Sequence, residues 1–92
     1  MKITQNNEST RGFFEATAED RLAGKVTYAW EGEDKIILDS TEVTDDFRGQ
    51  DVGKQLVYEA VNFARNNKVK IVPLCPFVKH IFDKDPTIHD VL

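Results

Sequence analysis

The stretch RGQDVGKQLVYEAVNFARNN, residues 48–67, changes the chain from a strand pattern to a helical one. Its apolar residues recur three or four positions apart, at Val52, Leu56, Ala60 and Phe63. This spacing is typical of one face of an amphipathic helix, and a pair of asparagines such as Asn66-Asn67 often ends a helix. We therefore predict a helix that begins at Val52 and ends near Asn67, after a glycine-containing loop.

Strands are predicted on the N-terminal side of this helix. Residues Leu22–Trp30 alternate between two faces, as in a strand. One face is expected to carry Leu22, Gly24, Val26, Tyr28 and Trp30, and the other Ala23, Lys25, Thr27 and Ala29. We also predict strands at Gly12–Ala18 and Lys35–Val43, and an edge strand at Met1–Gln5.

Shorter elements are predicted on the C-terminal side. Val69–Leu74 has the β-branched composition of a strand, and prolines 73 and 76 prevent it from continuing. Phe77–Phe82 is predicted to be a short helix with proline in its first turn, followed by the tail Asp83–Leu92. The predicted fold class is α+β, with antiparallel strands, a strand–helix–strand crossover and a short C-terminal helix in one domain, residues 1–92.

Composition excludes several classes of function. The 92 residues carry a net charge of −4, without the basic excess of nucleic-acid-binding proteins. No apolar run approaches the length of a membrane span, so no membrane association is expected. Cys75 is the single cysteine, so no disulfide can form within the chain and a reducing, cytoplasmic location is expected. No metal site is predicted, because Cys75, His80 and His89 are too few ligands for a zinc cluster.

Charge is unevenly distributed along the chain. Eight acids between Glu31 and Asp51 are accompanied only by Lys35 and Arg48, whereas cations dominate between residues 52 and 84. Such a division could pair an acidic face with a cationic substrate and a basic face with an anionic cofactor. The alternative is two solvated faces that partly neutralise each other.

The loop before the predicted helix has features of a phosphate-binding site. Gly49 and Gly53 leave backbone N–H groups exposed, and the helix N-terminus adds unpaired donors with a partial positive charge. Arg48 and Lys54 add two full positive charges, which favours a phosphate or pyrophosphate ligand. The spacing matches neither a Walker P-loop nor a dinucleotide-binding fingerprint. The alternative interpretation is a glycine turn that only leads into the helix.

The segment Arg48–Lys54 resembles the acyl-CoA pyrophosphate loop of the GNAT superfamily, usually written Q/R-x-x-G-x-G/A. Arg48 matches the first position and Gly53 the last, whereas Asp51 replaces the middle glycine. The downstream segment PLCPFV, residues 73–78, resembles minimal stand-alone GNAT-like N-acetyltransferase domains. This resemblance extends from about Gly12 to the C-terminus and implies a GNAT-like fold.

The resemblance implies an N-acetyltransferase that binds acetyl-CoA and transfers its acetyl group to an amine, either a small amine or a protein lysine. The residues that it implies around the cofactor pyrophosphate are Arg48, Gly49, Gln50, Asp51, Val52, Gly53 and Lys54. The backbone of Val43 would bind the pantetheine, and Val78 or Phe82 would border the cofactor arm. A backbone N–H near Glu42 or Val43 would polarise the thioester carbonyl.

Cys75 is the candidate catalytic residue. Near the thioester its thiol would act either as a nucleophile or as the acid that protonates the leaving CoA thiolate. The alternative is a buried small hydrophobic residue, the usual role of a free cysteine. Glu42, Asp45 and Asp46 are candidate bases by position, and each could equally be solvated surface.

Two positions depart from the pattern of the family. Asp51 places a carboxylate where a glycine usually lets the cofactor approach, and Ser40 stands where family members often carry a histidine. The missing histidine and the small size of the chain favour the alternative of a non-catalytic CoA or acyl-CoA sensor, or a protein-interaction module. A monomer or a weak dimer is expected, because a small sheet has edges that can pair.

Overall fold

A computed structural model describes all 92 residues, and its element order agrees with the prediction. The strands are β1 (Lys2–Asn7), β2 (Arg11–Ala18), β3 (Arg21–Trp30), β4 (Lys35–Val43) and β5 (Lys70–Pro73). The helices are α1 (Val52–Asn67) and α2 (Pro76–Lys84), with 3-10 turns η1 (Asp45–Phe47) and η2 (Pro86–Val91). The sheet order is β1-β2-β3-β4-β5, antiparallel up to β4 and parallel between β4 and β5. The predicted α+β class with a β4–α1–β5 crossover is confirmed.

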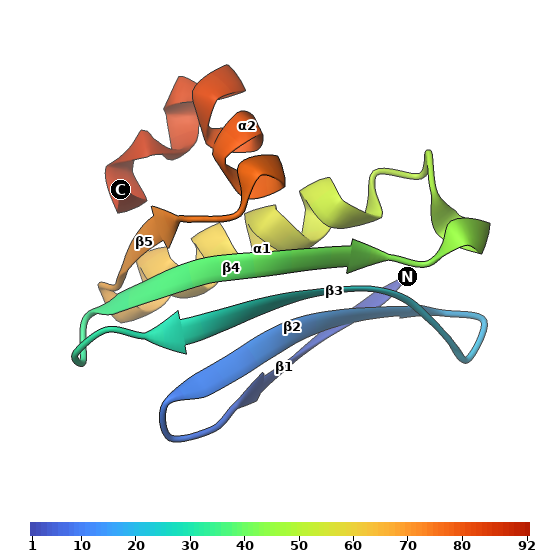
Figure 1. The fold of residues 1–92 in the computed structure, drawn as a ribbon, viewed down its shortest axis with the longest axis horizontal. Coiled ribbons are helices and arrows are strands. Elements are labelled where there is room, and N and C mark those ends of the chain that lie inside the picture. The colour runs from blue at the N-terminus through green and yellow to red at the C-terminus, as the bar shows by residue number, and fades with distance from the viewer.

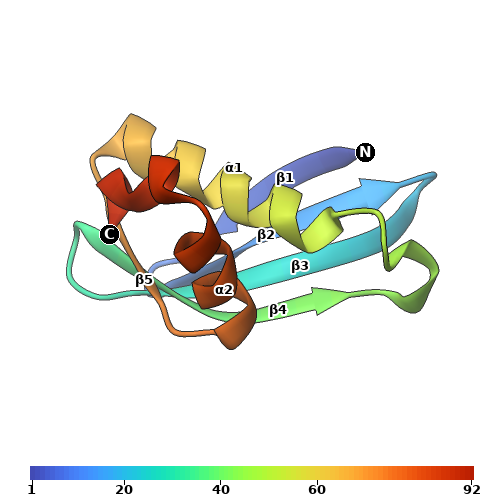
Figure 2. The same ribbon diagram turned by 90° about the horizontal axis from the view of Figure 1, so that it is seen from above.

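Both helices cover the same face of the sheet (Figure 1). Seen from above, α1 lies over the central strands and α2 lies beside it over β4 (Figure 2). The opposite face carries no helix. None of the helices is both long and apolar enough to cross a membrane.

Helix α1 supplies the largest helical part of the core. Its buried positions follow the predicted period and are Val52, Gly53, Leu56, Val57, Ala60, Val61 and Ala64. Lys68 ends the helix in the left-handed conformation, with φ 55°, and its N–H donates to the carbonyl of Ala64. The predicted bounds of this helix are therefore confirmed.

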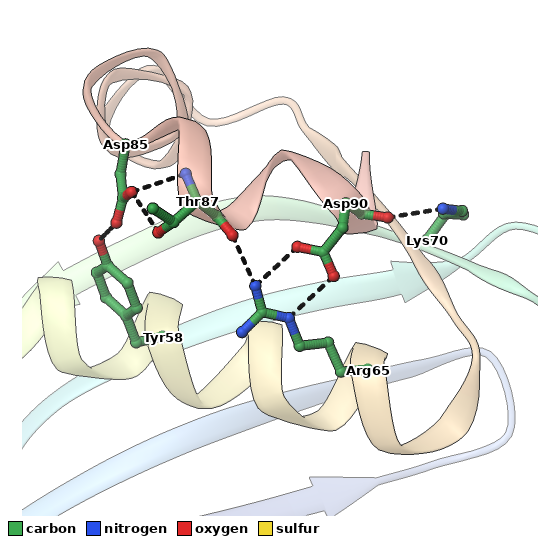
Figure 3. A network of polar contacts seen from close by, with 6 residues as sticks. All are labelled: Tyr58, Arg65, Lys70, Asp85, Thr87 and Asp90. Atoms are coloured by element: carbon green, nitrogen blue, oxygen red, sulfur yellow. Dashed lines mark hydrogen bonds and ion pairs between the residues drawn. The ribbon is translucent and has the colours of Figure 1, made fainter.

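The C-terminal end of α1 is fastened to the tail by a polar network (Figure 3). The Arg65 guanidinium donates to both carboxylate oxygens of Asp90, at 2.9 and 2.7 Å, and to the carbonyl of Thr87 at 2.8 Å. The Lys70 ammonium donates to the carbonyl of Asp90 at 2.7 Å. Beneath this network Ile88 is only 2% exposed, so η2 closes the end of the core.

A bulge in β3 overturns part of the predicted alternation. Gly24 pairs with Ala16 and Leu22 pairs with Thr17, which leaves Ala23 without a partner across the strand. An extra residue of this kind reverses the facing of the residues beyond it. Ala23 is therefore fully buried, like Val26 and Tyr28, whereas Leu22 is 44% exposed, so the predicted alternation is wrong at these two residues.

A second bulge, in β4, lies where β5 ends. Ser40 pairs with Thr27 and Leu38 pairs with Tyr28, so Asp39 is the extra residue. The pairing of β4 with β5 also ends at Leu38, whose carbonyl accepts hydrogen bonds from the N–H groups of residues 74 and 75 at 3.1 and 3.0 Å. Beyond this point β4 continues to Val43 without a strand neighbour on that side, and a fork opens between β4 and α2.

Candidate functional site

Cys75 lies at this fork as the residue before α2. Its thiol is half-buried and hydrogen-bonded to the Thr41 hydroxyl on β4, with 3.6 Å between Sγ and Oγ1. Burial disfavours the thiolate, but hydrogen bonds from the backbone of Val78, the Thr41 hydroxyl and the backbone of Phe77 outweigh it. The pKa of the Cys75 thiol is therefore lowered, which increases its thiolate fraction near neutral pH.

The loop before α1 leaves the helix N-terminus open. Asp51 adopts the left-handed conformation, with φ 59°, and its side chain makes no capping hydrogen bond. Gly49, with φ 83°, provides the preceding reversal of the chain. Helix geometry gives the N–H groups of residues 52–54 no intrahelical acceptor, and no other backbone carbonyl accepts from them. Three backbone donors are thus directed away from the helix, as in an anion-binding site.

A groove of about 330 Å³ lies over these donors, between the β4–α1 loop and α2. Its lining residues are Val43, Phe47, Arg48, Gly49, Asp51, Val52, Gly53, Lys54, Phe77 and Ile81. The structure thus brings together all the predicted residues of this loop except Gln50, which is exposed outside the groove. Val43, predicted on β4, lines the same groove.

The close packing of α2 on α1 explains the glycine at position 53. A Cβ atom there would lie 2.7 Å from the ring of Phe77 and 3.6 Å from a methyl group of Val43. The backbone of α1 can therefore approach α2 this closely only without a side chain at this position. The ring of Phe77 is 42% exposed and forms part of the groove wall.

Helix α2 presents to the groove other residues than those expected to border the cofactor arm. Val78 and Phe82, expected to border the cofactor arm, are 0% and 1% exposed and belong to the core. The groove is bordered instead by Phe77 and Ile81. All four residues are apolar, so the sequence pattern predicted the helix correctly but not which apolar side faces the sheet. Thr41 was also missed, because its contact with the thiol depends on how β4 and α2 meet.

A second hollow, of about 550 Å³, lies beside β3 and the end of β4. It shares Val43 and Arg48 with the groove, and two candidate bases, Glu42 and Asp45, line it. The third candidate, Asp46, instead pairs with Arg21 at 2.9 Å outside this hollow. Glu42 and Asp45 thus share the hollow with two cations, Lys25 and Arg48.

The two cationic side chains that line the groove differ in their ion pairing. Arg48 pairs with Asp45 at 3.0 Å, but both side chains are largely exposed, so this pair contributes little and can rearrange. The Lys54 ammonium makes no ion pair and lies 5.9 Å from the centre of the Tyr58 ring. Lys54 is therefore available to an anion in the groove.

His80 and His89 do not take part in this arrangement. Both are exposed, and neither lines the groove nor contacts Cys75. His89 is hydrogen-bonded to the carbonyl of Phe82 at 2.6 Å, on the side of α2 that meets the tail.

Comparisons with known proteins agree with this geometry. The sequence model described as GCN5-related N-acetyl-transferase matches residues 13–91. A GCN5-like protein from Staphylococcus aureus, solved by NMR, is 31% identical, with a TM-score of 0.71 over 98% of this chain and 85% of its own. No curated protein sequence matches the chain significantly.

More distant structures share the fold. The ribosomal-protein-alanine N-acetyltransferase of Brucella melitensis biovar Abortus 2308 is 20% identical, with a TM-score of 0.70 over 84% of this chain and 62% of its own. The aminoglycoside N-acetyltransferase AAC(6')-Iy, solved in complex with CoA, is 16% identical, with a TM-score of 0.64 over 90% of this chain and 88% of its own. Because the family model spans most of the sequence and the Staphylococcus aureus protein aligns with nearly all of it, this chain belongs to the family of GCN5-related N-acetyltransferases, which use acetyl-CoA as acetyl donor.

Proposed function

We propose that the protein transfers an acetyl group from acetyl-CoA to an amine, with the cofactor bound in the groove between the β4–α1 loop and α2. The observation that carries this proposal is the open N-terminus of α1. Its three unpartnered N–H groups lie in a groove that also contains Arg48 and Lys54. Donors, helix dipole and cations together favour a pyrophosphate.

The proposed pyrophosphate site comprises the loop residues Arg48, Gly49, Gln50, Asp51, Val52, Gly53 and Lys54. The carboxylate of Asp51 forms no cap, so it leaves the N–H groups free for the ligand. The proposed pantetheine site is the part of β4 around Val43 that β5 does not pair. Amides of the ligand can hydrogen-bond to a free strand edge in the way that an added strand does.

Acetyl-CoA supplies the acetyl thioester, and Cys75 at the fork is the proposed catalytic residue. Its lowered pKa suits a nucleophile, and its hydrogen bond with Thr41 holds the thiol toward β4. The same thiol, when protonated, could instead serve as an acid for the departing sulfur. Backbone N–H groups near Glu42 and Val43 are the proposed donors to the thioester carbonyl.

The hollow beside β4 is the proposed acceptor side. Glu42 and Asp45 line it together with Lys25 and Arg48, so its formal charges balance, and the Glu42 carboxylate is the proposed contact for an ammonium group. Glu42 is the better placed of the candidate bases, since Asp45 is paired with Arg48. The acceptor is either a small amine or a protein lysine.

A second candidate function is a CoA or acyl-CoA sensor without efficient catalysis. Ser40 stands where the family often has a histidine, and the side-chain partner of the Cys75 thiol is a hydroxyl rather than an imidazole. In that case the groove would bind the cofactor, and the hollow beside β4 would contact a partner protein instead of an acceptor amine.

Titration calorimetry with acetyl-CoA, followed by an acetyl-transfer assay on polyamines and a lysine peptide, tests both candidates. We expect saturable one-to-one binding and turnover that Cys75→Ala abolishes or strongly reduces. Binding without turnover on any amine would favour the sensor. Absence of saturation at millimolar acetyl-CoA would contradict both functions.

A further inference from the structure

The groove continues beyond the proposed pyrophosphate site into a second cavity between α1 and α2. This cavity has a volume of about 350 Å³ and shares Lys54 and Ile81 with the first groove. Its lining residues are Lys54, Tyr58, His80, Ile81, Lys84 and Asp85. A ligand that occupies the groove over the N-terminus of α1 can therefore extend directly into it.

The cavity is rich in cationic side chains that have no ionic partner. Neither Lys54 nor Lys84 forms a salt bridge, whereas Lys79, on the outer side of α2, pairs with Asp83 at 3.7 Å. His80 adds an imidazole that can donate a hydrogen bond. These three side chains come from both helices and surround the same space.

The one carboxylate of the cavity is already engaged by the protein. Asp85 accepts hydrogen bonds from the Tyr58 hydroxyl and from the N–H and hydroxyl of Thr87, the last two at 3.0 and 2.5 Å (Figure 3). These hydrogen bonds, together with the nearby charge of Lys54, lower the pKa of Asp85, so the carboxylate stays ionised and offsets one of the two ammonium charges. Lys54 and Lys84 together still give the cavity more positive than negative formal charge.

The geometry suits two anionic groups a short distance apart. On α2, Phe77, Ile81 and Lys84 are spaced by four and three residues, so they form one stripe along the groove. On α1, Lys54 and Tyr58 are one turn apart, which is about 6 Å along the helix axis. In coenzyme A a single ribose separates the 5′-diphosphate from the 3′-phosphate.

We propose that this cavity is a phosphomonoester subsite that binds the 3′-phosphate of coenzyme A. Lys84 and His80 are the dedicated ligands, and Lys54 lies between the diphosphate and the monoester. The subsite gives the protein a preference for acetyl-CoA over acetyl-dephospho-CoA. This inference rests on the proposed function, because it assumes that the diphosphate occupies the N-terminus of α1.

A phosphomonoester fits the cavity better than a singly charged anion. At neutral pH a monoester carries roughly −1.5 to −2 charges and three acceptor oxygens. Two ammonium groups and an imidazole offer several hydrogen-bond donors to these oxygens. The exposed rim of the cavity also lets the strongly hydrated phosphate keep part of its water shell.

The test compares acetyl-CoA with acetyl-dephospho-CoA by titration calorimetry at one fixed ionic strength. Wild-type protein should bind acetyl-dephospho-CoA about tenfold or more weakly, as expected for the loss of charge-assisted contacts. Lys84→Gln should weaken acetyl-CoA several-fold and leave acetyl-dephospho-CoA unchanged. The matched control is Lys79→Gln, which removes the same charge from the outer side of the same helix and should change neither affinity.

The results that would contradict the subsite can be distinguished from those that would contradict the proposed function. Equal affinity of wild-type protein for the two cofactors would overturn the subsite and leave the proposed function standing. An equal loss of acetyl-CoA affinity in Lys79→Gln and Lys84→Gln would also overturn it, because the effect would then be one of general charge. If neither cofactor binds, the proposed function fails, and the subsite fails with it. Circular dichroism of each variant shows whether the fold is retained.

Discussion

The two ends of helix α1 are built in opposite ways. At the C-terminal end, Lys68 caps the helix and Arg65 joins it to the tail through three hydrogen bonds. At the N-terminal end, Asp51 leaves the first N–H groups without partners, and the adjacent groove is open. One end satisfies its polar groups within the protein and the other does not. The closed end therefore contributes to stability, whereas the open end leaves three backbone donors without an acceptor.

The largest expected effect comes from disrupting the closed end. Ile88 is 2% exposed, and Ile88→Ala should lower the free energy of unfolding by about 3 kcal/mol through lost burial and a cavity. Urea denaturation measures this loss. The folded fraction should bind acetyl-CoA with unchanged affinity, and a parallel loss of affinity would show that the two ends are not independent.

The next effect comes from neutralising the open end. Arg48→Ala combined with Lys54→Ala should weaken acetyl-CoA binding by about 1–3 kcal/mol, because charge-assisted phosphate contacts are lost. Calorimetry measures the affinity, and urea denaturation should show little change in stability. The double variant Lys2→Ala/Lys79→Ala removes the same charge elsewhere and serves as control. Unchanged acetyl-CoA affinity in Arg48→Ala/Lys54→Ala would show that the open end does not bind the cofactor phosphates.

A smaller effect is expected at the fork beside the open end. The pKa of the Cys75 thiol is lowered, so its alkylation by iodoacetamide should reach half its maximal rate below the pH typical of a free cysteine. Thr41→Val removes one hydrogen bond to the thiol and should move this midpoint to higher pH. Thr44→Val, a nearby substitution outside the thiol's contacts, provides the comparison. If Thr41→Val left the pH midpoint of alkylation unchanged, the Thr41 hydroxyl would have no role in activating the thiol.

The smallest effect concerns acid sensitivity at the closed end. The Arg65 hydrogen bond lowers the pKa of Asp90, so this carboxylate contributes stability above the ordinary aspartate pKa of about 4. The contribution is lost as pH falls through the lowered pKa of the folded state. Arg65→Gln should therefore make the free energy of unfolding decline less steeply below about pH 4. Urea titrations at several acidic pH values measure this slope, and identical slopes would mean that the pair is not coupled to folding.

The sequence predicted the elements better than their contacts. The bounds of α1 follow from a repeated apolar spacing and two asparagines, both local features. The facing of Ala23 could not be predicted, because a bulge depends on how two strands pair. Which apolar residues of α2 face the groove could not be predicted for a similar reason, since Val78 and Phe77 are both apolar and the packing on the sheet selects between them.

In the candidate site, too, local features were predicted and contacts between elements were not. The loop residues Arg48 to Lys54 were predicted from a contiguous motif, and most of them line one groove. Phe77, Ile81 and Thr41 were missed, because they meet that motif only through the packing of α2 against β4. The roles of these residues toward a cofactor remain predictions.

The fork between β4 and α2 has a consequence for handling the protein. Beyond Leu38, β4 has no strand beside it where β5 has ended, and such edges promote association between chains. A molecule that binds along this edge both shields it and stabilises the folded state by mass action. Purified protein should therefore aggregate more slowly and melt at a higher temperature when coenzyme A is kept in the storage buffer.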